Sequence, residues 1–402
     1  MNVEKSEYKR LRIAVLNRVF SPTGGGAERY SIALVEELAS RHEIHVFAQQ
    51  INHQWPGVTY HKVSAPLLKP RWINQLWYAT ATWWATRRGF DVVHSHENTW
   101  HGQVQTMHVL PVKHNLFHGR TGIKRLLRSI KVLTSLRLLV YLLFERARLS
   151  GTARNHCVVV TSFSLLQIIE SNYPKITPTL KVITPGVQVF PTTGIEQKQS
   201  ARTSLGLPHS GSCILFVGHD YRKKGLDVLI KSLSELTEDT FLAVVGNPAQ
   251  IPLFRGLASK AGLGSRVFFL GALADVSVAY EAADVLAHPT LEDTFAMVVL
   301  EAMAHGLPVV VSDEHHCGIS ALLTDGVNAL LLDDPKDTKK LSTALKQVLQ
   351  DDVLRQTLSQ AAVDFSRLYQ WPEIARLQED IYLSVCKPVD CLAPGTSLNP
   401  RA

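Results

Sequence analysis

Two carboxylates stand eight positions apart, at Asp293 and Glu301. The segment 297–304, which holds Glu301, has the composition of a helix, and short apolar segments at 284–288 and 307–311 are expected to be buried strands. Asp293 then lies in a loop at the carboxyl end of a strand, where open α/β sheets bind ligands. Free backbone N–H groups at the start of a helix attract phosphate. We expect such groups on Thr294, Phe295, Ala296 and Met297.

The spacing of the two carboxylates suits a nucleotide sugar. A carboxylate within a helix is costly to bury without a hydrogen-bonding partner, and Glu301 could bind both hydroxyls of a ribose. Asp293 would then face the sugar beyond the phosphates. An Asp at a helix start is also commonly a cap, and paired carboxylates occur in glycoside hydrolases. The hydrolase interpretation is weak, because eight helical residues span about 12 Å whereas hydrolase carboxylates lie about 5–9.5 Å apart.

Three adjacent cations could bind the phosphates together with this helix. Arg222, Lys223 and Lys224 follow a predicted strand at 213–218 and precede a predicted helix at 226–236. Cations at the carboxyl end of a parallel strand lie at the ligand-binding edge of the sheet. The other interpretation is a solvated run of charge.

A run of three glycines lies between a predicted strand at 11–17 and a helix that ends near residue 40. Glycine lets the backbone approach a ligand closely, and the amides of Gly25 and Gly26 could cradle an anion. The run matches neither the dinucleotide-binding GxGxxG pattern nor the P-loop, and a flexible turn is the other interpretation.

Histidines end two predicted strands in the first half of the chain. His108 ends the strand at 103–109, so we expect it to point towards the same crevice. His94 and His96 end the strand at 90–96 and have the spacing of metal ligands. Because no carboxylate or cysteine is suitably placed near them, we expect no metal ion.

Composition bounds the class of protein. The 402 residues are 46% hydrophobic and 19% charged, enough to bury the cores of two domains. Five scattered cysteines without CxxC pairs fit a reducing compartment. The first ten residues lack the apolar core of a signal peptide, and no apolar run reaches about 18 residues. We therefore expect a cytoplasmic protein.

Charge is unevenly distributed along the chain. Residues 1–185 hold 24 Lys and Arg against 10 Asp and Glu, and the remainder holds 18 against 25. A basic half suits a polyanionic partner, and no nucleic-acid-binding motif is present. The segment 113–149 mixes nine Lys and Arg with bulky apolar residues, which is typical of a helix docked on an anionic membrane. A core helix with a solvated basic edge is the other interpretation.

Strand and helix patterns alternate in two separate series. This predicts an α/β protein with two Rossmann-like, doubly wound domains that face each other across a central cleft. We place the first domain at residues 1–186 and the second at residues 187–365, with a linker rich in Pro, Thr and Gly at the start of the second.

Together these segments resemble the retaining glycosyltransferases of family four, which have the GT-B fold. The resemblance covers roughly residues 10–385 and rests on GGGAER at 24–29, VG…KKG at 217–225 and D…EAMAHGLPVV at 293–310. It implies that the first domain binds the acceptor, that the second binds the nucleotide sugar, and that residues 366–402 cross back to the first domain before a tail. FERA at 144–147, GHDYRKKGLD at 218–227 and HP at 288–289 are similar to the lipopolysaccharide core glucosyltransferases. Those enzymes add glucose from UDP-glucose to a heptose at the inner membrane.

The resemblance assigns roles around the donor. It implies that Lys223 and Lys224 hold the diphosphate and that Glu301 binds the ribose. The backbone of residues 294–297 would contact the phosphate and the sugar, and Arg222 would replace an arginine that many relatives carry nearby in this loop.

Other positions depart from the family's pattern or match it only in part. Asp293 stands where the family usually has a longer glutamate, and His219 where many relatives carry arginine. His108 matches the histidine that contacts the donor sugar, although the lipopolysaccharide enzymes have an aspartate there. Gly25 and Gly26 would lie against the phosphates and the acceptor. The residues expected to act in catalysis are His108, Lys224 and Asp293.

The sequence thus predicts a retaining, metal-independent hexosyltransferase. It would move glucose from UDP-glucose to a saccharide acceptor, the lipopolysaccharide core or another lipid-linked glycan, at the inner face of the cell membrane. Its partners would be the nucleotide sugar, a glycan or glycolipid and an anionic membrane surface, with no cofactor and no nucleic acid. Two alternatives remain: a nucleotide-sugar epimerase of the same fold, and a catalytically inactive, membrane-associated partner.

Overall fold

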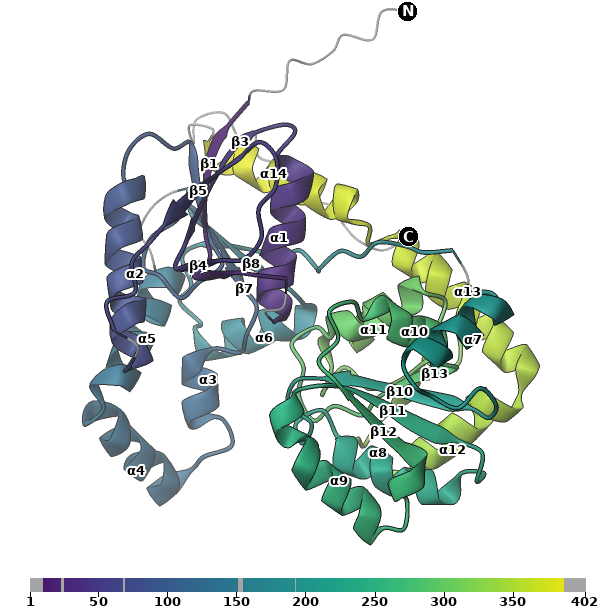
Figure 1. Cartoon of the computed structure of the whole chain (residues 1–402). Helices are drawn as coiled ribbons and strands as arrows, with labels where there is room; N and C mark the ends of the chain where they lie inside the picture. The colour runs from purple at the N-terminus through teal and green to yellow at the C-terminus, as the bar shows by residue number, and fades with distance from the viewer. Residues whose placement is uncertain (1–9, 23–24, 68, 151–154, 192, 387–402) are drawn as a thin grey trace, which may run out of the picture. The chain divides into compact units, whose positions relative to one another are not determined.

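The chain folds into two compact units (Figure 1). The computed structural model describes all residues except 1–9, 23–24, 68, 151–154, 192 and 387–402. Of the described residues, those within 1–160, 168–183 and 375–402 form the first unit, and those within 161–167 and 184–374 form the second. This division differs from continuous domains at 1–186 and 187–365, because the segment 161–167 belongs to the second unit. The chain returns to the first unit at Ala375, inside its last described helix.

The first unit is built on a seven-stranded sheet whose neighbouring strands are all parallel. In spatial order the strands are β5 (Val58–Lys62), β3 (Glu43–Ala48), β1 (Arg12–Leu16), β6 (Val92–Ser95), β7 (Val104–Met107), β8 (Cys157–Val160) and β9 (Thr179–Val182). A short parallel pair is formed by β2 (Val19–Phe20) and β4 (Gln50–Ile51). The chain winds outward from β1 in one direction and from β6 in the other, so the topological switch point lies between these two strands.

Strand composition explains this sheet. Every residue of β6, β7 and β8 is buried, as expected for parallel strands that are covered on both faces. The helices of this unit include α1 (Gly26–Leu38) and α2 (Arg71–Thr86), together with parts of α6 (Phe163–Asn172) and α14 (Trp371–Cys386). Tyr382 of α14 is fully buried, and its hydroxyl lies 2.6 Å from Nδ1 of His94 on β6. The last helix is therefore part of the core of the first unit.

The basic segment 113–149 forms three helices rather than one. They are α3 (Val112–Phe117), α4 (Gly122–Leu133) and α5 (Leu136–Leu149). Glu145 on α5 is buried, and its carboxylate accepts hydrogen bonds from the backbone amides of Val112 and Lys113, which begin α3. No helix in the described part of the chain combines the length and the apolar character needed to cross a membrane.

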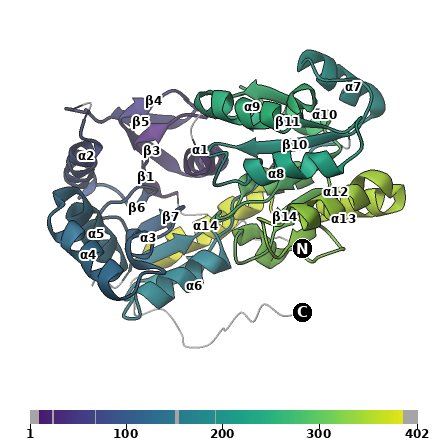
Figure 2. The same ribbon diagram turned by 90° about the horizontal axis from the view of Figure 1, so that it is seen from below.

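The second unit has a six-stranded sheet, again with all neighbours parallel. In spatial order the strands are β12 (Val267–Gly271), β11 (Phe241–Gly246), β10 (Cys213–Gly218), β13 (Val285–His288), β14 (Val309–Ser312) and β15 (Leu330–Leu332). Its switch point lies between β10 and β13. The α-helices around the sheet are α7 (Ile195–Ser204), α8 (Leu226–Ser232), α9 (Ile251–Lys260), α10 (Ser277–Ala282), α11 (Met297–Ala304), α12 (Thr338–Gln350) and α13 (Asp352–Arg367) (Figure 2).

Both faces of the second sheet are covered by hydrophobic packing. Along β10, Cys213, Leu215 and Val217 join one buried cluster, whereas Ile214 and Phe216 join the other. Successive side chains of a strand point to opposite faces, so this alternation assigns one cluster to each face. The two parallel sheets with their helices confirm the predicted α/β fold with two doubly wound domains.

Candidate active site

Two loops meet at the switch point of the second sheet. The loop at 219–225 follows β10, and the loop at 289–296 follows β13. The Leu291 amide donates to the Lys223 carbonyl at 2.9 Å and joins the loops through their backbones. Because β10 and β13 are neighbours whose connections run in opposite directions, their loops border the place where open α/β sheets bind ligands.

Gly225 allows the two loops to approach each other closely. Its φ of +77° lies in the left-handed region, and a Cβ at this position would be 2.0 Å from the Pro289 carbonyl oxygen. Any side chain here would force the loops apart. The glycine that follows the two lysines is therefore required by packing, and it holds Lys224 against the loop at 289–296.

The two lysines bind carboxylates of the neighbouring loop. Lys224 Nζ forms an ion pair with Asp293 Oδ2 and lies 3.2 Å from the Glu292 carbonyl oxygen. The Lys224 and Asp293 side chains are only 18% and 16% exposed. Lys223 pairs with the Glu292 carboxylate, but both side chains are nearly half exposed, so water screens this pair. Arg222 is exposed, and within the part of the chain that the structure describes its guanidinium makes no ion pair.

The Asp293 carboxylate has three further partners. Oδ2 lies 3.3 Å from His288 Nε2, and Oδ1 accepts from the amides of Phe295 at 3.3 Å and Ala296 at 3.0 Å. Burial raises the pKa of Asp293, but the His288 hydrogen bond and the Lys224 charge outweigh it and hold the pKa well below its usual range. Burial lowers the pKa of His288. The neutral His288 ring therefore donates its Nε2–H to the ionised carboxylate.

These contacts correct the expectation that all four amides at 294–297 are free. The amides of Phe295 and Ala296 are bonded to Asp293, whose side chain orders the turn that leads into α11. Ala296, directly before α11, has a φ of 70°, which is uncommon for a residue other than glycine. The Asp293 carboxylate thus occupies part of the position expected for phosphate. This arrangement is close to the interpretation of Asp293 as a helix cap.

Glu301 has the hydrogen-bonding partner that a half-buried carboxylate needs. Tyr280 on α10 donates its hydroxyl to Glu301 Oε2 at 2.8 Å. Sequence reasoning did not use Tyr280, and it used His288 only as part of the HP motif at 288–289, without a role in the site. His288 could have been found, since it is the last residue of the strand that precedes the Asp293 loop. No sequence signal connects Tyr280, 21 positions earlier in the chain, with Glu301.

The remaining predicted residues belong to the first unit. Gly25 precedes α1 and Gly26 begins it, and a Cβ on Gly25 would lie 3.0 Å from Glu28 Oε2. His108 follows the carboxyl end of β7, and its Nε2 lies 3.0 Å from His96 Nδ1. That these residues share one ligand with the Lys224 loop stays a prediction.

His94 and His96 are buried and form a cluster with the partly buried His108. The ring centroids are 4.2 Å apart for His94 and His96 and 5.3 Å apart for His96 and His108. Both nitrogens of His94 are engaged, by the Tyr382 hydroxyl and by Thr106 Oγ1 at 2.7 Å. Burial lowers the pKa of both His94 and His108 to about 3, so the two rings are neutral at physiological pH. Among the described residues, no group of three or more His, Cys, Asp or Glu side chains could hold a metal ion.

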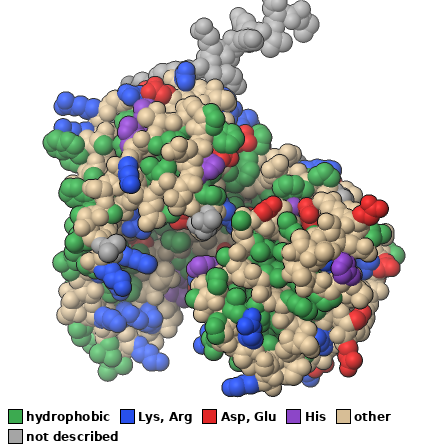
Figure 3. Space-filling model, in the orientation of Figure 1, with side chains coloured by type: hydrophobic (Ala, Val, Ile, Leu, Met, Phe, Trp, Pro, Cys, Tyr) green, Lys and Arg blue, Asp and Glu red, His purple; other side chains and the backbone are tan. Residues whose placement is uncertain are grey.

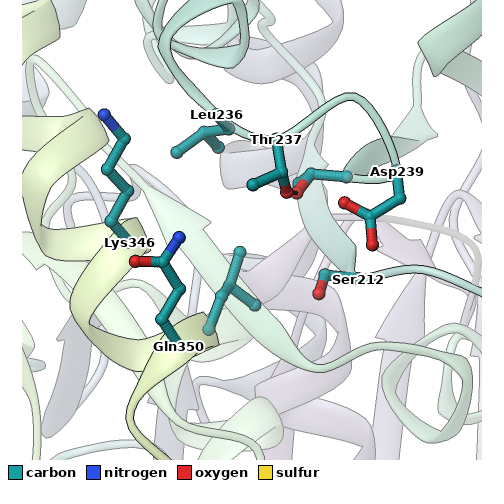
Figure 4. A pocket seen from close by; sticks show the side chains of 8 residues that line it. Ser212, Leu236, Thr237, Asp239, Lys346 and Gln350 are labelled. Carbon is teal, nitrogen blue, oxygen red and sulfur yellow. Dashed lines mark hydrogen bonds between the residues drawn. The ribbon is translucent and has the colours of Figure 1, made fainter.

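A pocket of about 220 Å³ lies at the opposite edge of the second sheet. Ser212 precedes β10 and Thr240 precedes β11, so the pocket faces the amino ends of the strands. Its labelled side chains in Figure 4 are Ser212, Leu236, Thr237, Asp239, Lys346 and Gln350. Ligands of open α/β sheets bind at the other edge, and no predicted site residue lines this pocket.

Comparisons with known proteins agree with this two-part architecture. Residues 24–189 match the family described as Glycosyltransferase Family 4, and residues 197–365 match Glycosyl transferases group 1. A D-inositol 3-phosphate glycosyltransferase of Corynebacterium urealyticum is 31% identical over 243 residues, which is 57% of this chain and 56% of that protein. The lipopolysaccharide glucosyltransferase WaaG of Escherichia coli is 28% identical over 247 residues, 58% of this chain and 64% of that protein. The chain therefore matches less than two thirds of the length of these curated relatives.

Solved structures share the fold over nearly the whole chain. A crystal structure of WaaG superposes with a TM-score of 0.77 at 22% identity, covering 92% of this chain and 99% of that one. The Anabaena protein HepE, in complex with UDP-glucose, has a TM-score of 0.72 at 18% identity, with 93% and 100% covered.

Proposed function

Since this chain belongs to the glycosyltransferases that combine a family 4 domain with a group 1 domain in the GT-B fold, we propose that it transfers a hexose from a nucleoside diphosphate sugar to an acceptor hydroxyl. One observation carries the proposal: the Lys224 ammonium meets the Asp293 carboxylate at the switch point of the second sheet. A cation at this edge, beside the start of α11, suits a diphosphate.

The donor would extend across the residues described above. Lys224 and Lys223 bind the diphosphate, and Glu301 binds the ribose hydroxyls. Asp293 faces the sugar, and His108 keeps the role of a sugar contact that the resemblance implies for it. Because Asp293 bonds two of the amides before α11, the lysines carry most of the diphosphate contact while this carboxylate stays in place.

The reaction needs a stabilised leaving group more than a strong base. The bond between the anomeric carbon and the phosphate oxygen breaks, and negative charge grows on the departing diphosphate. Lys224 and Lys223 stabilise that charge, as fixed charges do in many active sites. The acceptor oxygen bonds to the anomeric carbon on the face that the diphosphate leaves, and its proton passes to the departing phosphate oxygen. The configuration at the anomeric carbon is then retained, and no metal ion takes part.

We propose UDP-glucose as the donor. Two similar proteins support it, since WaaG is a glucosyltransferase and the structure of HepE holds UDP-glucose. Thermal shift with UDP-, GDP- and ADP-sugars tests the base. Lys224→Ala should lower kcat/KM by orders of magnitude, whereas Lys231→Ala, an exposed lysine on α8, should not. Turnover should be unchanged in chelator. Full activity of Lys224→Ala would remove this lysine from the mechanism.

Incubation of the protein with UDP-glucose and no acceptor separates this function from the two alternatives. Slow release of UDP with free glucose supports transfer. An epimerised sugar formed without any acceptor favours an epimerase, and absence of nucleotide binding favours an inactive partner.

We propose that the acceptor is a lipid-linked glycan and that α4 docks the enzyme on the inner face of the membrane. On α4, Ile123, Leu126 and Leu127 are 73%, 59% and 61% exposed, and Ile130 and Leu133 continue the same helical face. Four basic residues lie on the rest of the helix: Lys124, Arg125, Arg128 and Lys131. A shallow groove is lined by Arg120, Lys124, Leu127, Arg128 and Lys131. Figure 3 shows Lys and Arg side chains gathered with hydrophobic ones over this part of the first unit. This pattern fits an interfacial helix on anionic lipid.

Vesicle co-sedimentation tests the docking. Lys124→Glu/Arg128→Glu should abolish binding to vesicles rich in phosphatidylglycerol, because each cation contributes about 1 kcal/mol near an anionic surface. The matched control is Lys231→Glu/Lys260→Glu, two exposed lysines of the second unit. Unchanged binding of the α4 variant would reject membrane docking.

A further inference from the structure

Glu301 does not hold its orientation alone. We propose that Tyr280 is a positioning residue, whose hydroxyl fixes the Glu301 carboxylate in the orientation that binds the ribose of the donor. The two residues come from different helices, α10 and α11, and Tyr280 Oη lies 2.8 Å from Glu301 Oε2. The inference rests on the proposed function, because it takes ribose binding by Glu301 as its starting point.

The Tyr280 ring is itself held firmly. It is only 4% exposed and stacks on His305, with centroids 5.2 Å apart and planes at 27°. His305, four residues after Glu301, is 6% exposed and stacks in turn on Phe190, at 4.2 Å and 13°. The Phe190 amide donates to the carbonyl of Ala304 at 3.2 Å and ties this stack to the end of α11. A ring packed in this way cannot turn its hydroxyl elsewhere without disturbing the core.

A fixed hydrogen-bond donor matters because a glutamate side chain is flexible. Glu301 is only half-buried, and a long side chain at such a position has several rotamers of similar energy. A hydrogen bond from the buried Tyr280 phenol selects one rotamer of Glu301. The entropy cost of ordering the Glu301 side chain is then met before the nucleotide binds. Tyr280 would therefore contribute to affinity for the ribose without touching it.

The experiment compares nucleotides that differ only in the ribose. Calorimetric titration of the full chain with UDP, 2′-deoxy-UDP and 3′-deoxy-UDP gives an affinity ratio, which is insensitive to a loss of folded protein. Wild type should prefer UDP, and Glu301→Gln should lose most of this preference. Tyr280→Phe should reduce it about three- to tenfold, which is the effect expected for the loss of one hydrogen bond. The matched control is Tyr221→Phe, whose buried hydroxyl has no hydrogen-bond partner among the described residues.

The outcomes separate the two proposals. If Tyr280→Phe keeps the wild-type ratio, or weakens all three nucleotides equally, while Glu301→Gln loses the ratio, then Tyr280 is only structural and this inference is overturned. If wild type has no preference for UDP and Glu301→Gln changes nothing, the ribose role in the proposed function fails and the inference fails with it. A reduced ratio in Tyr280→Phe with an unchanged ratio in Tyr221→Phe supports the positioning role.

Discussion

The Lys224–Asp293 pair has a stabilising energy that can be measured. Asp293→Asn keeps the size of the side chain and an oxygen that can still accept from the amides of Phe295 and Ala296. It removes the charge opposite an ammonium that is only 18% exposed. Removing one partner of a fully buried pair costs about 3–5 kcal/mol, and the residual exposure lowers our expectation to about 2–3 kcal/mol.

The loss should depend on pH in a defined direction. The pKa of Asp293 is lowered in the folded state, so the ionised carboxylate stabilises the fold above the unfolded pKa of about 3.9. That contribution is lost as the pH falls through the lower, folded-state pKa. The difference in unfolding free energy between wild type and Asp293→Asn should therefore be constant from about pH 8 to pH 5 and shrink below about pH 4.

A double-mutant cycle with Lys224→Met isolates the pair. Urea unfolding followed by circular dichroism should give a coupling energy of about 1.5–3 kcal/mol between the two positions. The control is Asp364→Asn, which breaks an exposed pair with Arg367 on α13 and should cost less than about 0.5 kcal/mol. A coupling energy of zero, with Asp293→Asn no more costly than Asp364→Asn, would refute our account of the site.

Three further substitutions test the surrounding structure. Gly225→Ala should lower the free energy of unfolding by at least about 2 kcal/mol and reduce activity, because its Cβ meets the Pro289 carbonyl. Glu145→Ala should cost about 2–4 kcal/mol by chemical denaturation, because it leaves the start of α3 and the Tyr173 hydroxyl without their acceptor. Asp293→Glu should lose about 1 kcal/mol in the same assay, since the longer side chain loses the local bonds to the following amides.

The first two of these substitutions have a matched comparison in the same chain. Gly326 also has a positive φ, of +71°, but a Cβ there meets nothing within 4 Å, so Gly326→Ala should cost clearly less than Gly225→Ala. Glu170 is exposed on α6, and Glu170→Ala should leave stability nearly unchanged. Equal costs within either pair would contradict the structural explanation. For Asp293→Glu, unchanged stability would show that the bonds to the amides add nothing.

Much of the second unit could be predicted from its sequence. The expected strand at 213–218 and helix at 297–304 have the bounds that β10 and α11 show. The strand ends at Gly218 and the helix ends two residues before Gly306. A continuous apolar run in an alternating series is typical of a covered parallel sheet. The rule that ligands bind at the carboxyl ends of strands identified the two loops that meet.

What the pattern could not predict is the pairing between distant side chains. Lys224 and Asp293 are 69 positions apart, and only the folded register brings the ammonium to the carboxylate instead of leaving it free. Periodicity also could not predict that the segment 113–149 forms three helices, because its apolar and basic residues suit one long amphipathic helix. In the structure, buried Glu145 binds the start of α3 across that segment, a tertiary contact that local propensity does not contain.

The shorter acid at position 293 gives this site its electrostatic character. An aspartate reaches the amides two and three residues ahead, so one side chain can order the turn before α11 and pair with Lys224 at the same time. Lys223 is likewise paired with Glu292, so both lysines approach a donor as neutralised pairs rather than as a free cationic surface. Within the described contacts, Lys224 uses two of its three N–H groups, one on Asp293 and one on the Glu292 carbonyl. One N–H group of the ammonium is then left to donate a hydrogen bond to a ligand. In the proposed function, affinity for the diphosphate would therefore depend on the placement of single N–H groups more than on net positive charge.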